Sequence, residues 1–364
     1  MIALPTAMPP DAQPEILLVR TGTFNGLRVL SWAGDIIYAS RGYKLLRAQV
    51  PPNQASMAGL RWSAVASFRS TWWRQITSVH NLSARLVRDG FHALAVLPSG
   101  GLVAAVPGAI VTLSPGETEF RVTRAITRGT RPLHITCIPN GTILWGEYFD
   151  NAARDEVHVY ASSDGGATWN VAYTFPKRAI RHIHNIVYDR WQDCIWILTG
   201  DYGDECRILR ASCDLRELEP VMRGNQQARA VALVPAEDGV YFSSDTPFEI
   251  NHVYHMDRRG QLSDMAVLGS SSIYGCRVGR SMFFSTMVEP SPMNKDRHVG
   301  IYGSGNGATW NSLLAWQKDR WPMKLFQYGN AIFPDGDNRT EYLAVTSIAV
   351  ESEDLVMSLY SVRP

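Results

Sequence analysis

Short apolar runs separated by turn residues recur along almost the whole chain. In residues 92–106, a polar residue precedes an apolar run, a Pro-Ser-Gly-Gly turn and a second apolar run. Short runs of this kind, bounded by Gly, Pro, Asn or Asp, predict β-strands. No long segment shows the periodicity of about 3.6 residues that is typical of an amphipathic helix. The pattern therefore predicts an all-β protein.

The same unit repeats at a nearly constant spacing. Six copies begin at His92, His134, His184, Arg229, Tyr274 and Tyr328, at intervals of 42, 50, 45, 45 and 54 residues. A period of about 40–50 residues is typical of a four-stranded propeller blade. A seventh unit fits residues 27–39, and residues 15–20 can supply the strand that the last unit lacks. We therefore predict a seven-bladed β-propeller of four-stranded antiparallel blades, in which the N-terminal strand closes the last blade.

The predicted domain organisation follows from this repeat. Residues 1–14 are rich in Pro and Ala and are expected to form a flexible N-terminal segment. Residues 15–364 are expected to form one propeller domain, because a closed array of blades folds as a single unit despite its length. An insertion near residues 50–90 interrupts the spacing between the first two units.

Composition restricts the partners and the compartment. The net charge is +1, and no basic cluster with interleaved aromatic residues occurs, so nucleic acid and anionic membranes are not expected partners. The N-terminus lacks the basic start and apolar core of a secretory signal. The five cysteines show no C-x-x-C spacing. We expect a cytoplasmic protein, or a secreted one if the chain is a processed form.

One short motif resembles a known family. The stretch Ser162-Ser-Asp164-Gly-Gly166-Ala-Thr168-Trp169 fits S-x-D-x-G-x-T-W and resembles the Asp box, or BNR repeat, of sialidases and other sugar-handling propellers. The resemblance implies that Asp164 is a structural residue in the turn between two outer strands. A second copy, residues 303–310, keeps Gly, Thr and Trp but lacks the aligned Ser and Asp. The Arg-Ile-Pro motif of true sialidases is absent, which argues against sialidase activity.

The repeat also predicts a ligand site. In propellers, the inner strand of each blade starts at the axial opening, where ligands usually bind. The predicted polar pocket contains the strand-heading residues and their polar neighbours, namely His92, His134, His184, Arg229, Tyr274, Tyr328, Gln327, Arg181 and His182, together with Glu147 and Asp201, which follow second strands. The alternative is that each of these residues makes a local hydrogen bond at the start of its own strand.

The first chemistry that suits this pocket is β-elimination on a glycan that contains uronic acid. The reaction needs a base, an acid for the leaving oxygen and a cation that neutralises the carboxylate. Propeller-shaped polysaccharide lyases that use His, Tyr and Arg are known as a class. We expect His134 or His184 to be the base, Tyr274 the acid and Arg229 the neutralising residue.

Three alternatives remain open. A pair of carboxylates can hydrolyse a glycosidic bond. His92, His134 and His184 can bind a divalent metal ion if they converge on the axis, and such an ion can replace Arg as the neutralising group. The propeller can also be a non-catalytic platform for a glycan or a protein, because the fold alone does not determine an activity. The expected partner is an oligosaccharide or polysaccharide, with an acidic glycan favoured.

Overall fold

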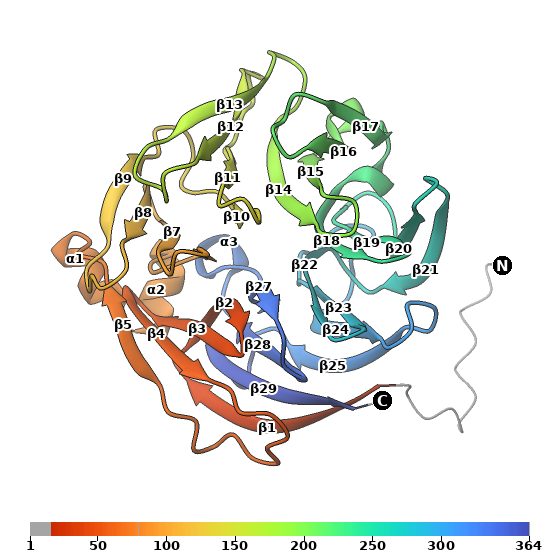
Figure 1. Cartoon of the computed structure of the whole chain (residues 1–364). Helices are drawn as coiled ribbons and strands as arrows, with labels where there is room; N and C mark the ends of the chain where they lie inside the picture. The colour runs from red at the N-terminus through yellow and green to blue at the C-terminus, as the bar shows by residue number, and fades with distance from the viewer. Residues whose placement is uncertain (1–15, 79, 364) are drawn as a thin grey trace, which may run out of the picture.

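The computed structural model describes residues 16–78 and 80–363 and shows a ring of seven β-sheets around a central axis (Figure 1). The chain is therefore an all-β, seven-bladed propeller, as the sequence repeat predicts. The segment expected to be flexible, residues 1–14, lies outside the described residues. None of the helices in the described ranges is long and apolar enough to cross a membrane.

We number the blades 1 to 7 in chain order, and each consists of consecutive antiparallel strands. Blade 1 contains β2 (Arg28–Gly34), β3 (Ile36–Arg41), β4 (Lys44–Gln49) and β5 (Ser63–Ser67). Blade 2 contains β6 (Ala93–Val96), β7 (Leu102–Val106), β8 (Ala109–Leu113) and β9 (Arg121–Ala125). Blade 3 contains β10 (Thr136–Cys137), β11 (Ile143–Gly146), β12 (Val157–Ser162) and β13 (Asn170–Phe175).

The remaining blades follow the same order from the axis outwards. Blade 4 contains β14 (His182–Asp189), β15 (Cys194–Gly200), β16 (Arg207–Ser212) and β17 (Leu218–Arg223). Blade 5 contains β18 (Ala230–Ala236), β19 (Gly239–Ser244), β20 (Asn251–Asp257) and β21 (Leu262–Leu268). Blade 6 contains β22 (Ser272–Val278), β23 (Ser281–Thr286), β24 (His298–Ser304) and β25 (Asn311–Gln317). Blade 7 contains β26 (Asn330–Ile332), β28 (Tyr342–Ile348), β29 (Val356–Arg363) and β1 (Leu17–Asn25).

The two ends of the described chain close the ring. Strand β1 pairs antiparallel with β29, from Leu17 opposite Arg363 to Asn25 opposite Val356. This arrangement agrees with the predicted closure by the N-terminal strand. Blade 1 has one strand more than predicted, because β27 (Asp335–Asn338) pairs in parallel with the inner side of β2.

Buried apolar side chains fill the spaces between neighbouring blades. Leu27 and Val29 of blade 1, for example, share one buried cluster with Tyr342 and Leu359 of blade 7. Across this seam the Val29 amide donates a hydrogen bond to the Thr346 hydroxyl at 3.0 Å. Because each blade buries apolar side chains against both neighbours, the array becomes stable only when the ring is complete.

The segment between blades 1 and 2 contains two short helices that the strand pattern did not predict. They are α1 (Trp72–Thr77) and α2 (Asn81–Val87), and α3 (Met323–Phe326) lies next to α2 near the centre of the ring (Figure 1). The Arg85 guanidinium, on α2, is buried and donates to Asp319 at 2.7 Å, to Asp354 at 3.1 Å and to the Phe326 carbonyl. There are also two short 3₁₀ helices in the described residues. The first, η1 (Gly203–Glu205), follows the second strand of blade 4, and the other, η2 (Gln226–Ala228), precedes the inner strand of blade 5.

The S-x-D-x-G-x-T-W stretch forms the turn between β12 and β13. The Ser162 hydroxyl accepts a hydrogen bond from the Gly166 amide at 2.9 Å, and Asp164 accepts from the Thr168 amide and hydroxyl at 2.9 and 2.6 Å. These bonds lower the pKa of Asp164 to about 2. Gly166 has φ +88°, and a Cβ there would lie 2.8 Å from Val103 of the neighbouring blade 2. The turn therefore requires glycine for both its conformation and its packing.

The second copy of this turn departs from the sequence alignment. Between β24 and β25, the Ser304 hydroxyl accepts from the Gly307 amide and the Asn306 side chain accepts from the Thr309 amide, both at 2.9 Å. The expectation that this copy has lost the Ser was therefore wrong, and Asn306 takes the place of the lost Asp. Ser304 and Asn306 make equivalent bonds one residue nearer to the glycine. A third turn, between β16 and β17, has Ser212 and Asp214 in similar positions.

We predict that Asp164→Ala destabilises the protein by about 1 kcal/mol at pH 7, because the turn loses hydrogen bonds to a charged acceptor. The folded-state pKa of Asp164 is depressed, so its contribution is fully present above about pH 4 and is lost as the pH falls towards 2. Urea unfolding at several pH values measures both effects. The control is Glu156→Ala, at an exposed acid outside the turn. A loss of stability that does not change with pH would contradict this role.

Candidate functional site

Polar residues at or just before the starts of inner strands, and just after the ends of second strands, lie together at one end of the axis. We call this group the axial ring; its members are Arg28, Arg88, His92, Arg131, Tyr148, His182, His184, Asp201, Arg229, Asp245, Tyr274, Glu289 and Tyr328. Tyr148 is close enough to Asp201, Asp245, Arg229 and Glu289 for their charges to affect its pKa. Tyr328 is similarly affected by Glu289 and Arg88. The ring is therefore one continuous electrostatic environment.

Irregular strand pairing helps to direct these side chains. The pairing of the inner strand with the second strand shifts register near the strand start in blades 1, 4, 5 and 6. In blade 4 the shift lies between Ile183 and Asn185, at His184. Such a bulge leaves one residue without a pairing partner and changes the direction of its side chain. The bulge in blade 4 thus contributes to the orientation of His184.

Blades 1 to 3 provide the basic half of the ring. Burial and the charges of Arg28 and Arg88 lower the pKa of Arg131 to about 9, so Arg131 remains charged at pH 7. Burial and the charges of Arg131, Arg28 and Arg88 lower the pKa of His92, which therefore stays neutral. Within residues 16–78 and 80–363, no carboxylate forms an ion pair with Arg28, Arg88 or Arg131. This half can therefore bind an anionic group from a ligand.

Blades 4 to 6 provide the acidic half. Asp201, Asp245 and Glu289 each follow the second strand of their blade, and Arg229 Nη2 lies 3.6 Å from Asp201 and 3.8 Å from Asp245. Burial and the charge of Asp245 raise the pKa of Glu289 to about 7, and burial raises the pKa of Asp245. Despite its burial, Asp201 keeps a strongly lowered pKa because the rings of His182 and His184 contact its carboxylate. The acidic half of the axial ring therefore contains both protonated and ionised carboxyl groups near neutral pH.

Two buried histidines converge on Asp201. His182 Nε2 and His184 Nε2 are 3.1 Å apart, and Asp201 Oδ1 lies 3.5 Å from the first and 3.2 Å from the second. The Arg181 guanidinium donates to the other oxygen of Asp201 at 3.0 Å. Gly200 makes room for this arrangement, because a Cβ there would lie 2.6 Å from the His184 ring.

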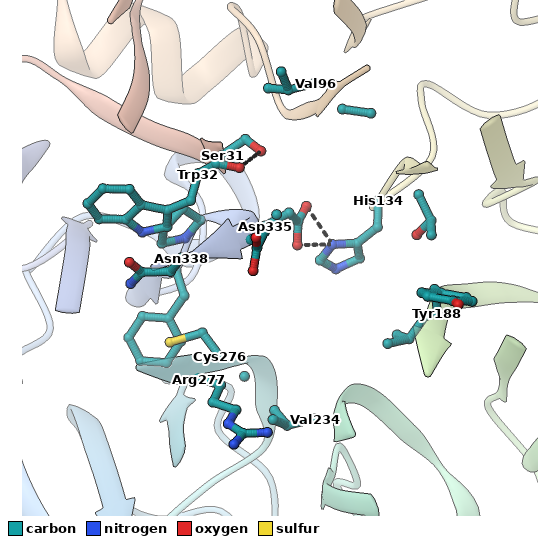
Figure 2. A pocket seen from close by; sticks show the side chains of 18 of the residues that line it. Ser31, Trp32, Val96, His134, Tyr188, Val234, Cys276, Arg277, Asp335 and Asn338 are labelled. Atoms are coloured by element: carbon teal, nitrogen blue, oxygen red, sulfur yellow. Dashed lines mark hydrogen bonds and ion pairs between the residues drawn. The ribbon is translucent and has the colours of Figure 1, made fainter. Parts of the chain in front are cut away.

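His134 and Tyr274 face an axial cavity of about 1230 Å³ that is lined by all seven blades. Asp335, on β27, contacts His134 Nδ1 at 3.1 Å (Figure 2). The rings of His134 and Tyr274 are 6.2 Å apart between centroids, and Tyr274 also neighbours Arg28. Trp32 and Tyr188 contribute aromatic surface to the same cavity (Figure 2). A cavity of this size can hold several sugar units.

The structure separates the residues that the sequence grouped into one pocket. His182, His184, Asp201, Arg181 and Arg229 lie together, whereas His134 and Tyr274 meet on the cavity side. Glu147 forms an ion pair with Arg128 and accepts from the His158 amide at 2.8 Å. Gln327 donates to the Arg85 carbonyl, and His92 Nε2 contacts the Arg88 carbonyl at 2.8 Å.

The expected metal set of His92, His134 and His184 is not brought together. Among the described residues, the one group of at least three His, Cys, Asp or Glu side chains with converging ligand atoms is His182, His184 and Asp201. His184 thus remains a candidate ligand, but its partners come from its own blade.

Some ring residues were not among the predicted site residues, although the sequence contains signals for them. Asp245 and Glu289 follow second strands in the same way as Asp201. Arg88 and Arg131 stand four and three residues before the histidines that begin the repeat in blades 2 and 3, as Arg181 stands three residues before His184. Asp335 gives no such signal, because β27 is additional to the repeat.

Comparisons with known proteins show the fold alone. No family model and no curated protein matches the chain. A chain of the mitotic checkpoint complex is 9% identical, with a TM-score of 0.59, and the match covers 99% of this chain and 98% of that one. A catalytically inactive virginiamycin B lyase from Staphylococcus aureus, crystallised with quinupristin, is 9% identical, with a TM-score of 0.58 and coverages of 95% and 99%. An ancestral GH74 enzyme is 13% identical, with a TM-score of 0.55 and coverages of 96% and 48%.

We predict that Gly200→Ala displaces the His184 ring and destabilises the protein by about 1–3 kcal/mol, because the added methyl group overlaps the imidazole. Urea unfolding measures the loss, and NMR of the histidine side chains reports the displacement. Gly59→Ala is the matched control, since its Cβ would meet no atom within 4 Å. Unchanged stability and unchanged His184 signals would contradict this packing.

Proposed function

We propose that the protein is a lyase that cleaves a glycan containing uronic acid by β-elimination. The observation that carries the proposal is the group of Arg28, Arg88 and Arg131 without carboxylate partners among the described residues, next to Tyr274. Arg28 and Arg131 are partly buried and Arg88 is exposed, and a cationic group of this kind suits the carboxylate of a uronic acid. Its charge would stabilise the negative charge that develops when the C5 proton leaves.

His134 is our candidate for the base. Asp335 contacts its Nδ1, which favours the tautomer with a hydrogen on Nδ1 and leaves Nε2 free to accept a proton. His184 suits this role less well, because its Nδ1 contacts the Ala230 carbonyl at 2.8 Å and its Nε2 faces His182 and Asp201.

The reaction would then proceed as follows. His134 Nε2 takes the C5 proton, a double bond forms between C4 and C5, and the C4–O bond breaks. The Tyr274 hydroxyl protonates the leaving oxygen and recovers its proton from solvent. Arg229, the cation expected from the sequence, lies near Asp201 and Asp245. We therefore assign the neutralising role to Arg28, Arg88 and Arg131, which form no ion pair with a carboxylate among the described residues.

The comparisons supply only an analogy of fold. The virginiamycin B lyase of similar fold was made catalytically inactive by replacing a histidine with alanine, and the GH74 enzyme shares the same architecture. A propeller of this size can therefore support catalysis. The fold does not itself assign the reaction, because propellers as different as the WD40 domain of Doa1 share it.

We predict that Arg131→Met lowers kcat/KM on uronate oligosaccharides by about 100- to 1000-fold, because a partly buried positive charge next to the developing anion is lost. The measurement is the rise in absorbance near 235 nm from the unsaturated uronate. Arg216→Met, at an exposed arginine, is the control and should leave the rate unchanged. Absence of this absorbance across a broad panel of uronate glycans would exclude the lyase, and binding without cleavage would favour a non-catalytic platform.

The acidic half favours glycoside hydrolysis as the second candidate function. The environments of Glu289 and Asp201 shift their pKa values in opposite directions, which suits an acid and a base that act together. In this reaction Glu289 would protonate the leaving oxygen, and Asp201 would act in its ionised form.

If hydrolysis is the reaction, the rate should fall as the pH rises through about 7, because Glu289 loses the proton that it donates. Glu289→Gln should then reduce the rate by at least about 100-fold. New reducing ends without absorbance near 235 nm would identify hydrolysis. The control is Glu219→Gln, at an exposed glutamate on an outer strand. Full activity of Glu289→Gln would exclude Glu289 as the acid.

The turn chemistry supports a broader relationship. The bonds of Ser162, Asp164 and Thr168 suit an Asp box, and similar bonds recur at Ser304 and Asn306. We propose that the chain is related to Asp-box propellers in the broad sense, apart from the true sialidases. This relationship would fit a carbohydrate ligand, but it gives no catalytic role to Asp164.

A further inference from the structure

We propose that His182, His184 and Asp201 form a binding site for one divalent transition-metal ion. The ligands are the two imidazole Nε2 atoms and the Oδ1 atom of Asp201. The proposal is independent of the lyase reaction, because it rests on the geometry of these three side chains.

The hydrogen bonds of the two rings determine which nitrogen atoms are free. His182 Nδ1 lies 2.9 Å from the Phe149 carbonyl, and His184 Nδ1 lies 2.8 Å from the Ala230 carbonyl. A carbonyl only accepts, so each Nδ1 carries a hydrogen. In the neutral rings both Nε2 atoms therefore present lone pairs to one another at 3.1 Å. That contact is repulsive unless a proton or a metal ion lies between them.

Backbone carbonyls also commonly accept the hydrogen bond that a metal-bound histidine donates from its other ring nitrogen. Such a bond from Nδ1 fixes the orientation of the ring and increases the basicity of Nε2. Both imidazoles are therefore prepared for coordination in the same way.

The separations of the three ligand atoms suit a metal polyhedron. The two Nε2 atoms are 3.1 Å apart. Asp201 Oδ1 lies 3.2 Å from His184 Nε2 and 3.5 Å from His182 Nε2. With bonds of about 2.0–2.1 Å, neighbouring ligands are about 2.9 Å apart in an octahedron and about 3.4 Å apart in a tetrahedron. The observed distances lie close to this range, so a small shift of the side chains would complete the site.

Several polar groups surround this position. Asp201 accepts a hydrogen bond from Arg181 through Oδ2, and its Oδ1 has Arg229 Nη2 at 3.6 Å in addition to the two imidazoles. On the other side of Arg229, Asp245 Oδ1 is buried without a hydrogen-bond partner among the described residues and offers a further oxygen. A donor set of two imidazoles and one carboxylate suits Zn²⁺, Co²⁺, Mn²⁺ or Fe²⁺ better than Mg²⁺ or Ca²⁺.

The experiment titrates the full-length, EDTA-treated protein with Co²⁺ and follows the visible absorbance of the bound ion. We expect one equivalent to bind and to be displaced by Zn²⁺. His184→Ala and Asp201→Asn should each weaken Co²⁺ binding at least tenfold. His252→Ala is the matched control, because His252 forms another His–carboxylate pair, with Asp264 at 2.7 Å on the outer strands of blade 5. This variant should bind Co²⁺ as the wild type does.

A second measurement does not depend on variants that fold. In ¹⁵N NMR spectra of the metal-free wild type, we expect both Nε2 atoms to be unprotonated at neutral pH and both signals to shift with one equivalent of Zn²⁺. A proton shared between the two rings, together with no stoichiometric Zn²⁺ binding, would overturn the proposal. Co²⁺ binding that survives in both His184→Ala and Asp201→Asn would overturn it as well.

Discussion

Pairing between β1 and β29 is the constraint on which the rest of the molecule depends. The outermost strand of blade 7 comes from the beginning of the described chain, so the last blade cannot form until both ends meet. Once the ring is closed, all seven inner strands line one axis. The axial ring then collects side chains that are up to 300 residues apart in sequence, from Arg28 to Tyr328.

The charge distribution around the axis gives the site its chemical character. Blades 1 to 3 present arginines without acidic partners among the described residues, whereas blades 4 to 6 present carboxyl groups that share Arg229. The charges of Glu289 and Arg88, one from each half, affect the pKa of Tyr328. A ligand with one anionic group and several hydroxyl groups fits such an asymmetric ring better than a uniformly charged polymer does. This asymmetry underlies our preference for an acidic sugar.

The two candidate sites use different residues. His134, Asp335 and Tyr274 face the axial cavity, while His182, His184 and Asp201 form a buried cluster in blade 4. Next to that cluster, the ring centroid of Tyr148 lies 4.4 Å from that of His182, and the pKa of Tyr148 is raised by burial and by neighbouring carboxylates, so it remains a neutral hydrogen-bond donor. The proposed acid–base pair and the proposed metal site therefore share no residue.

The sequence by itself determined the class of the fold. Alternating apolar runs and turn residues specify strands, and their constant spacing specifies blades, because these signals act within a few residues. It also identified one face of the axis, where His134, His184, Tyr274 and Arg229 begin their strands. Only the tertiary structure decided which of these side chains meet. Strand bulges such as the one at His184, the glycine that admits its ring and the added strand β27 with Asp335 set those distances. Such features arise from packing between segments remote in sequence, which no local pattern records.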